Sequence, residues 1–105
     1  MENQALYENG TAIATTSQVE SGFIDVRNFN KLVISRKATG GVYVFEIDWS
    51  DDGVTADVTE TVSTVNNDQV DQPVASKYAK FRVKNTDGSV AFTNHKTSVM
   101  GQIGQ

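Results

Sequence analysis

Three aspartates surround the only tryptophan of the chain in the segment 48–53, which reads Asp-Trp-Ser-Asp-Asp-Gly. Carboxylates ahead of a glycine suggest a calcium loop, in which oxygen ligands stand at alternate positions and a glutamate follows. The spacing of Asp48, Asp51 and Asp52 departs from that pattern, although Asp51, Asp52 and Asp57 could form a looser site. The serine-to-glycine part is also typical of a turn, because Ser and Asp bind neighbouring backbone N–H groups and Gly adopts positive φ. We expect a turn and no bound metal.

Two further arrangements could support catalysis. Glu46 and Asp48 would share one face of a strand, and glycoside hydrolysis uses two carboxyl groups held roughly 5–10 Å apart. His95 is the only histidine, and a Ser-His-Asp arrangement is formally possible because Ser and Asp abound. However, no apolar or histidine-lined surroundings mark the carboxylates, and no Gly-x-Ser-x-Gly motif occurs. We therefore expect a solvent-facing strand side, an ordinary strand histidine and no enzymatic activity.

Two groups of residues could bind a partner protein. Lys80, Arg82 and Lys84 alternate along one expected strand, so they form a basic face that could dock on an acidic surface. The alternative is a solvated sheet face, whose charges also protect an edge strand from aggregation. Leu6 and Tyr7, near the N-terminus, could become ordered on a neighbouring subunit, although a single exposed aromatic residue is unremarkable.

The elements that must position these residues are strands. The chain holds 14 Val, 5 Ile and 11 Thr but only 2 Leu, and side chains branched at Cβ fit a pleated sheet better than a helical core. The alternation is clearest over 42–49, where Tyr43, Phe45, Ile47 and Trp49 share one face. Further strands are expected at 11–16, 19–26, 31–38, 58–65, 70–75, 78–85 and 90–100.

About eight strands with closely spaced turns predict an all-β protein, an antiparallel β-sandwich of jelly-roll-like form. The strand at 70–75 is expected at a sheet edge, because Pro73 has no N–H to donate. We expect a loose N-terminal arm over 1–12, one β-sandwich domain over 13–100 and a C-terminal tail over 101–105. The strand order does not follow from the sequence.

Charge and composition exclude several classes of protein. The 9 Lys and Arg residues are scattered among 13 Asp and Glu residues, for a net charge of −4, so no nucleic-acid partner is expected. The absence of Cys excludes a disulfide scaffold, a thiolate nucleophile and a cysteine zinc site, and no cofactor is expected. The first ten residues are acidic and short of apolar residues, and no run of 18 apolar residues occurs. We expect no membrane contact and a protein made in a cytoplasm and used without export.

A series of strand and turn segments runs through the stretches 21–53 and 72–92. The segments read SGFIDV at 21–26, LVIS at 32–35, GVYV at 41–44, SDDG at 50–53, PVA at 73–75 and YAKFRVKN at 78–85. This series resembles small β-sandwich proteins and modules of tailed-phage virions, and for a chain this short the capsid decoration (cement) proteins match best. The N-terminal and C-terminal segments lie outside the resemblance.

The resemblance implies a structural virion protein that binds the outer surface of the assembled coat and stabilises it. The implied partner is the major capsid (coat) protein, and the implied form is a homo-oligomer, often a trimer in such families. The implied location is the capsid surface of the virion, after assembly in the host cytoplasm. An alternative is a carbohydrate- or receptor-binding β-sandwich module of a tail fibre or spike, with Tyr7, Phe29 and Tyr78 as candidate aromatic contacts. The expected partner contacts are Leu6, Tyr7, Lys80, Arg82 and Lys84.

Overall fold

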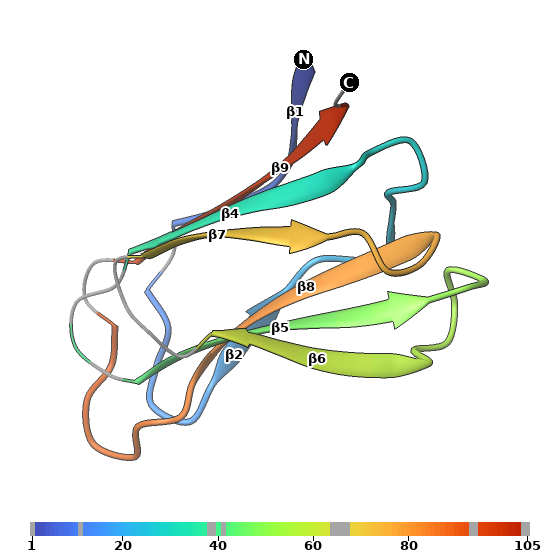
Figure 1. The fold of residues 1–105 in the computed structure, drawn as a ribbon. Coiled ribbons are helices and arrows are strands. Elements are labelled where there is room, and N and C mark those ends of the chain that lie inside the picture. Colours follow the sequence, from blue (N-terminus) through green and yellow to red (C-terminus); the bar gives the residue numbers. More distant parts are fainter. Residues whose placement is uncertain are drawn as a thin grey trace.

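Two antiparallel β-sheets packed face to face make up the structure (Figure 1). The computed structural model describes residues 2–10, 12–37, 40, 42–63, 68–92 and 95–103. Within these residues there is no helix, and hence none that is long and apolar enough to cross a membrane. The strands are β1 (Glu2–Asn9), β2 (Gln18–Glu20), β3 (Ile24–Asp25), β4 (Lys31–Lys37), β5 (Tyr43–Ser50), β6 (Val58–Ser63), β7 (Asp68–Pro73), β8 (Tyr78–Asn85) and β9 (Lys96–Ile103).

The strand pairing is that of a jelly-roll-like sandwich. A four-stranded sheet has the order β1-β9-β4-β7, and a five-stranded sheet has the order β2-β8-β5-β6 with β3 also paired to β8. The pairs β1–β9, β2/β3–β8, β4–β7 and β5–β6 are nested within one another along the chain, and all are antiparallel. The prediction of an all-β antiparallel sandwich is confirmed. One expected strand, 19–26, is split into β2 and β3, which both pair with β8.

The core lies between the sheets and is built mainly from β5 and β8. The predicted inner face of β5 is confirmed, since Tyr43, Phe45, Ile47 and Trp49 are each at most 3 % exposed. Every second residue of β8 is buried as well. The other buried apolar side chains are Ile13, Val26, Leu32, Ile34, Ala79, Phe81, Val83, Phe92 and Val99. Each sheet also has an outer, polar face, and a functional site must therefore be sought on these two faces.

The prediction of a loose arm over residues 1–12 is wrong for Glu2–Asn9, which form β1 and pair with β9. The register shifts between Ala5 and Tyr7, so a β-bulge interrupts the period of two that marks a strand in the sequence. An edge strand also buries only part of its surface, which explains its polar composition. In Figure 1 the N- and C-terminal ends of the described chain lie close together on this sheet.

The described parts of the segments 11–16 and 90–100 contain less strand than predicted. Of the described residues 12–16, only Ile13 pairs, in an isolated bridge with Phe92, and the last strand begins at Lys96. The buried Asn85 side chain contributes to this, because its amide donates to the carbonyl oxygens of Val90 (2.9 Å), Ile13 and Ala14 (both 3.4 Å). A side chain thus satisfies backbone groups that a strand would otherwise pair.

The chain terminus also differs from the prediction. Residues 101–103, expected as part of a polar tail, continue β9. The expectation that 70–75 form an edge strand is confirmed for β7, which is outermost in its sheet and ends at Pro73. Parts of the other predicted segments lie outside the described residues, namely residues 1, 11, 38, 41, 64, 65, 93, 94, 104 and 105.

Candidate functional site

The basic residues of β8 lie on the outer face of the five-stranded sheet, directly beside acidic residues of β5. The strand register places Arg82 opposite Glu46 and Lys80 opposite Asp48. Lys84 also reaches Glu46, with 3.6 Å between its Nζ and Oε1. The basic face and the carboxylate pair, which the sequence presents as separate features, therefore form one surface.

Arg82 binds all three carboxylates of this surface. Its Nη2 and Nη1 donate to Asp48 Oδ1 and Oδ2 at 2.8 and 2.9 Å, which is a bidentate pair. Its Nε donates to Glu46 Oε1 at 3.0 Å, and Nη1 also reaches Glu20 Oε2 at 3.3 Å. We call this group the Arg82 network; its three cations and three carboxylates are Lys80, Arg82, Lys84, Glu20, Glu46 and Asp48.

The electrostatics of Asp48 argue against a role as a general acid. Burial of the carboxyl raises its pKa, but hydrogen bonds from Arg82 and Thr59 and the charges of Arg82 and Lys80 outweigh that effect, so the pKa lies below its ordinary value. A glycosidase general acid needs the opposite shift. Because the Arg82 network sums to zero charge, Lys80, Arg82 and Lys84 do not present an unopposed basic patch to a partner.

Leu6 and Tyr7 belong to β1 and pack against the core as partly buried side chains. The Tyr7 ring stacks on Phe81 of the opposite sheet, with 6.1 Å between the ring centroids. These two predicted partner contacts therefore anchor β1 to the sandwich.

Phe29 and Tyr78, the other aromatic candidates for sugar stacking, have packing partners within the chain. A Cβ atom on Gly101 would lie 2.6 Å from the Phe29 ring, so this ring rests directly on the backbone of β9. The Arg27 guanidinium lies over the Tyr78 ring, 5.4 Å from its centroid. These contacts weaken the hypothesis of an aromatic sugar platform.

The acidic segment after Trp49 folds on itself as the predicted turn. Asp52 Oδ1 accepts from the backbone N–H groups of Val54 and Thr55, both at 2.9 Å. Ser50 Oγ accepts from the N–H of Gly53, whose φ is 75°. The carboxylate oxygens thus bind backbone donors, and no group of three His, Cys, Asp or Glu residues within the described ranges could hold a metal ion.

His95 lies between the sheets at 5 % exposure. Its Nε2 and the Tyr43 hydroxyl each lie 2.7 Å from Thr97 Oγ1, and its ring stacks on Phe92 with a centroid distance of 5.8 Å. Burial raises the pKa of Tyr43 well above its ordinary value. These buried polar groups bind one another, so the arrangement stabilises the core.

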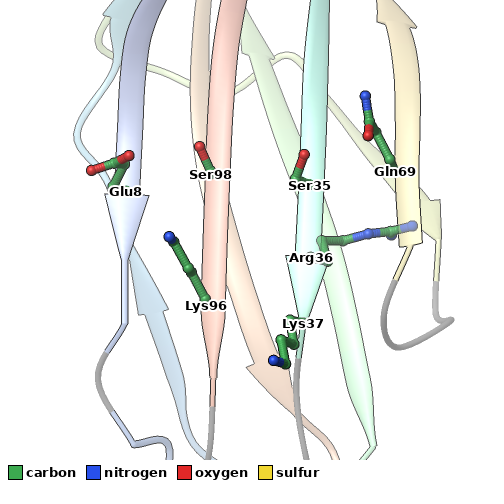
Figure 2. Close-up of a pocket in the computed structure, with 7 residues that line it drawn as sticks. All are labelled: Glu8, Ser35, Arg36, Lys37, Gln69, Lys96 and Ser98. Atoms are coloured by element: carbon green, nitrogen blue, oxygen red, sulfur yellow. The ribbon is translucent and has the colours of Figure 1, made fainter.

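A polar depression on the outer face of the four-stranded sheet was not anticipated from the sequence (Figure 2). Its volume is about 580 Å³, and its walls come from all four strands. One lining residue, Arg36, is itself buried, with its guanidinium over the Tyr43 ring. The residues that line the depression are Glu8, Ser35, Arg36, Lys37, Gln69, Lys96 and Ser98.

These lining residues are far apart in the sequence, and only the strand register brings them together. Ser35 and Lys37 of β4 lie opposite Ser98 and Lys96 of β9, and Glu8 of β1 lies opposite Ser98. The alternation of β4 indicates that Ser35 and Lys37 face outward, but it does not identify their neighbours.

No protein-family model matches this chain, and neither a curated protein nor a solved structure is significantly similar to it.

Proposed function

We propose that this chain is a structural virion protein, a capsid decoration (cement) protein that binds the outer surface of an assembled coat and stabilises it. The jelly-roll-like sandwich supports this, because viral capsid domains use the same architecture. The groups with catalytic character, Asp48 and His95, are bound to Arg82 and Thr97 within the fold. The protein acts by binding alone, as a homo-oligomer on the capsid surface, with the coat protein as its partner.

The observation that carries this proposal is the edge of β1. This strand ends the four-stranded sheet, and its second side pairs with no described strand. It has eight residues, whereas the other edge strands are shorter: β6 and β7 have six residues each, β2 has three and β3 has two. β7 also ends in Pro73, which cannot donate a backbone hydrogen bond. An extended segment of the coat protein or of a second copy can add a strand to β1 through main-chain hydrogen bonds.

Co-sedimentation with coat shells prepared without this chain tests the proposal. The test variant lacks residues 1–5, which removes the part of the edge before the bulge but keeps Leu6 and Tyr7 on the core. We expect the complete chain to saturate a fixed number of positions on the shell. The truncated chain is expected to bind at least about tenfold more weakly, a loss of roughly 1.4 kcal/mol.

The matched control is Asp71→Asn, which changes one charge on β7, the opposite edge of the same sheet. It should bind shells as the complete chain does. Thermal unfolding followed by the fluorescence of Trp49, which is 3 % exposed, establishes that both variants are folded. Unchanged occupancy by a folded truncated chain would rule out the β1 edge as the contact. If the complete chain fails to bind shells at all, the decoration role itself is wrong.

The alternative function is a carbohydrate- or receptor-binding module of a tail fibre or spike. The depression on the four-stranded sheet favours it, because ligand sites are typically concave, with volumes of roughly 300–1,000 Å³ and a few convergent polar groups. Its lining is polar and ionic, so any saccharide bound there is held by hydrogen bonds and charge.

A further inference from the structure

Two lysines of the depression are direct neighbours across a strand pair. Lys37 of β4 and Lys96 of β9 are direct partners in the antiparallel register, and both side chains are exposed. Like charges directly opposite each other in a sheet are destabilising. Neither amine forms an ion pair with a carboxylate of the described residues, in contrast to Lys31 of the same sheet face, which binds Asp71 at 2.9 Å. Among the described side chains, positive charge is therefore in local excess here, although the net charge of the chain is −4.

A row of hydrogen-bonding groups lies next to the lysine pair. Ser98 is the register partner of both Ser35 and Glu8, and Gln69 of β7 lies opposite Ser35 on its other side. Figure 2 shows these four side chains across the four strands, with Lys96 directed towards Glu8 and Ser98 and the Lys37 amine turned towards β9. The depression thus offers two cations at one end and hydroxyl, amide and carboxylate groups beside them.

The chemistry of these groups specifies what would fit them. Two ammonium groups attract an anion. They bind it best when it lies between them and accepts hydrogen bonds from both, as a carboxylate of the chain would in an ion pair. Glu8, in contrast, accepts hydrogen bonds only and repels an anion, so a fitting ligand must also carry donors. Carbohydrate hydroxyl groups supply such donors beside a sugar carboxylate. A volume of about 580 Å³ is large enough for one or two sugar rings.

We propose that this depression is a binding site for an acidic saccharide. The carboxylate of a uronic or similar acidic sugar lies between Lys37 and Lys96, and its hydroxyl groups bind Ser35, Ser98 and Glu8. The proposal is independent of the decoration function, because it concerns the face of the four-stranded sheet and not the β1 edge.

Titration of the isotope-labelled chain followed by amide NMR signals tests the site. The probes are glucuronic-acid oligosaccharides, glucose oligosaccharides of the same length, citrate and an oligoglutamate peptide. We expect saturable shifts for the uronic-acid probe, concentrated at Glu8, 35–37 and 96–98. Affinity for glucose oligosaccharides should be at least about tenfold lower, and added salt should weaken binding of the acidic probe because it screens the charges.

The double variant Lys37→Gln/Lys96→Gln should reduce affinity for the uronic-acid probe at least about tenfold while remaining at least as stable, since it removes a repulsion. The matched control Lys31→Gln removes one charge from the same sheet face and should bind normally. Equal binding of citrate and the uronic-acid probe would reduce the site to a simple anion site and overturn the saccharide assignment. Binding of oligoglutamate alone would assign it to an acidic protein segment, and the absence of saturable shifts with every probe would refute it.

Discussion

Replacing Asp48 by Asn tests whether the Arg82 network stabilises the fold. The Asp48 side chain is 6 % exposed and that of Arg82 is 15 % exposed. The burial of this ion pair is therefore intermediate between that of an exposed pair and that of a fully buried pair. Asp48 accepts two bonds from Arg82 and a third from Thr59 Oγ1 at 2.7 Å. An asparagine keeps one acceptor oxygen but turns an N–H₂ group towards Arg82, so one donor loses its partner.

The expected loss follows from these contacts. Exposed ion pairs contribute about 0–1 kcal/mol, and removal of one partner of a buried pair costs about 3–5 kcal/mol. Glu46 and Glu20 still neutralise Arg82 in the variant, which excludes the upper end of that range. We expect Asp48→Asn to lower the free energy of unfolding by about 2–3 kcal/mol, or the melting temperature by roughly 10–20 °C.

Urea unfolding followed by Trp49 fluorescence measures this loss, and its pH dependence identifies the cause. The folded-state pKa of Asp48 is lowered, so its contribution is complete above the unfolded pKa of about 3.9 and is lost as the pH falls through the folded value. The stability difference between the two proteins should be constant above about pH 5 and should shrink as the pH falls below 4.

The control is Asp71→Asn, because Asp71 also pairs with a lysine across two strands but is 59 % exposed. It should change stability by less than about 0.5 kcal/mol. The reasoning is refuted if Asp48→Asn costs no more than this control. It is also refuted if the difference between wild type and Asp48→Asn stays constant from pH 7 to pH 3.

Two further substitutions test the packing. Gly101→Ala should cost about 1–3 kcal/mol in urea unfolding, because its Cβ would lie 2.6 Å from the Phe29 ring, whereas Gly22→Ala, with nothing within 4 Å, should be nearly neutral. Equal stability of the two alanine variants would contradict the close contact. Thr97→Val should cost about 1–3 kcal/mol in the same assay, because it leaves the buried Tyr43 hydroxyl without its partner at 2.7 Å. A loss below about 0.5 kcal/mol would show that this hydroxyl finds another partner.

The sequence predicted the elements whose pattern is local. The alternation over 42–49 correctly placed Tyr43 and Trp49 on a buried face, because in a strand the side-chain direction depends only on the parity of the residue number. The Ser-Asp-Asp-Gly turn was predictable for the same kind of reason, since Asp52 binds backbone groups only two and three residues away. β1 was missed because its bulge breaks the alternation.

The arrangement of the surface residues was harder to predict, because it depends on which strands are neighbours. The sequence predicted an outward position for both Asp48 and Arg82, and it left the basic face as either a docking patch or a solvated sheet face. Their pairing across β5 and β8 turns that patch into a neutral ion network. A pattern of period two gives the face of each residue but carries no information on the residue beside it in the sheet.

The sequence by itself therefore determined the all-β class, the buried faces and the turns, since these follow from β-branched composition and local alternation. Tertiary structure alone decided the nested strand order, and with it the free edge of β1 and the depression on the four-stranded sheet. Lys37 and Lys96 illustrate the difference. Each was an ordinary polar residue in the sequence, and the β4–β9 register makes them direct neighbours of like charge. Register is fixed by long-range packing of the two sheets, which no local stretch of the chain encodes.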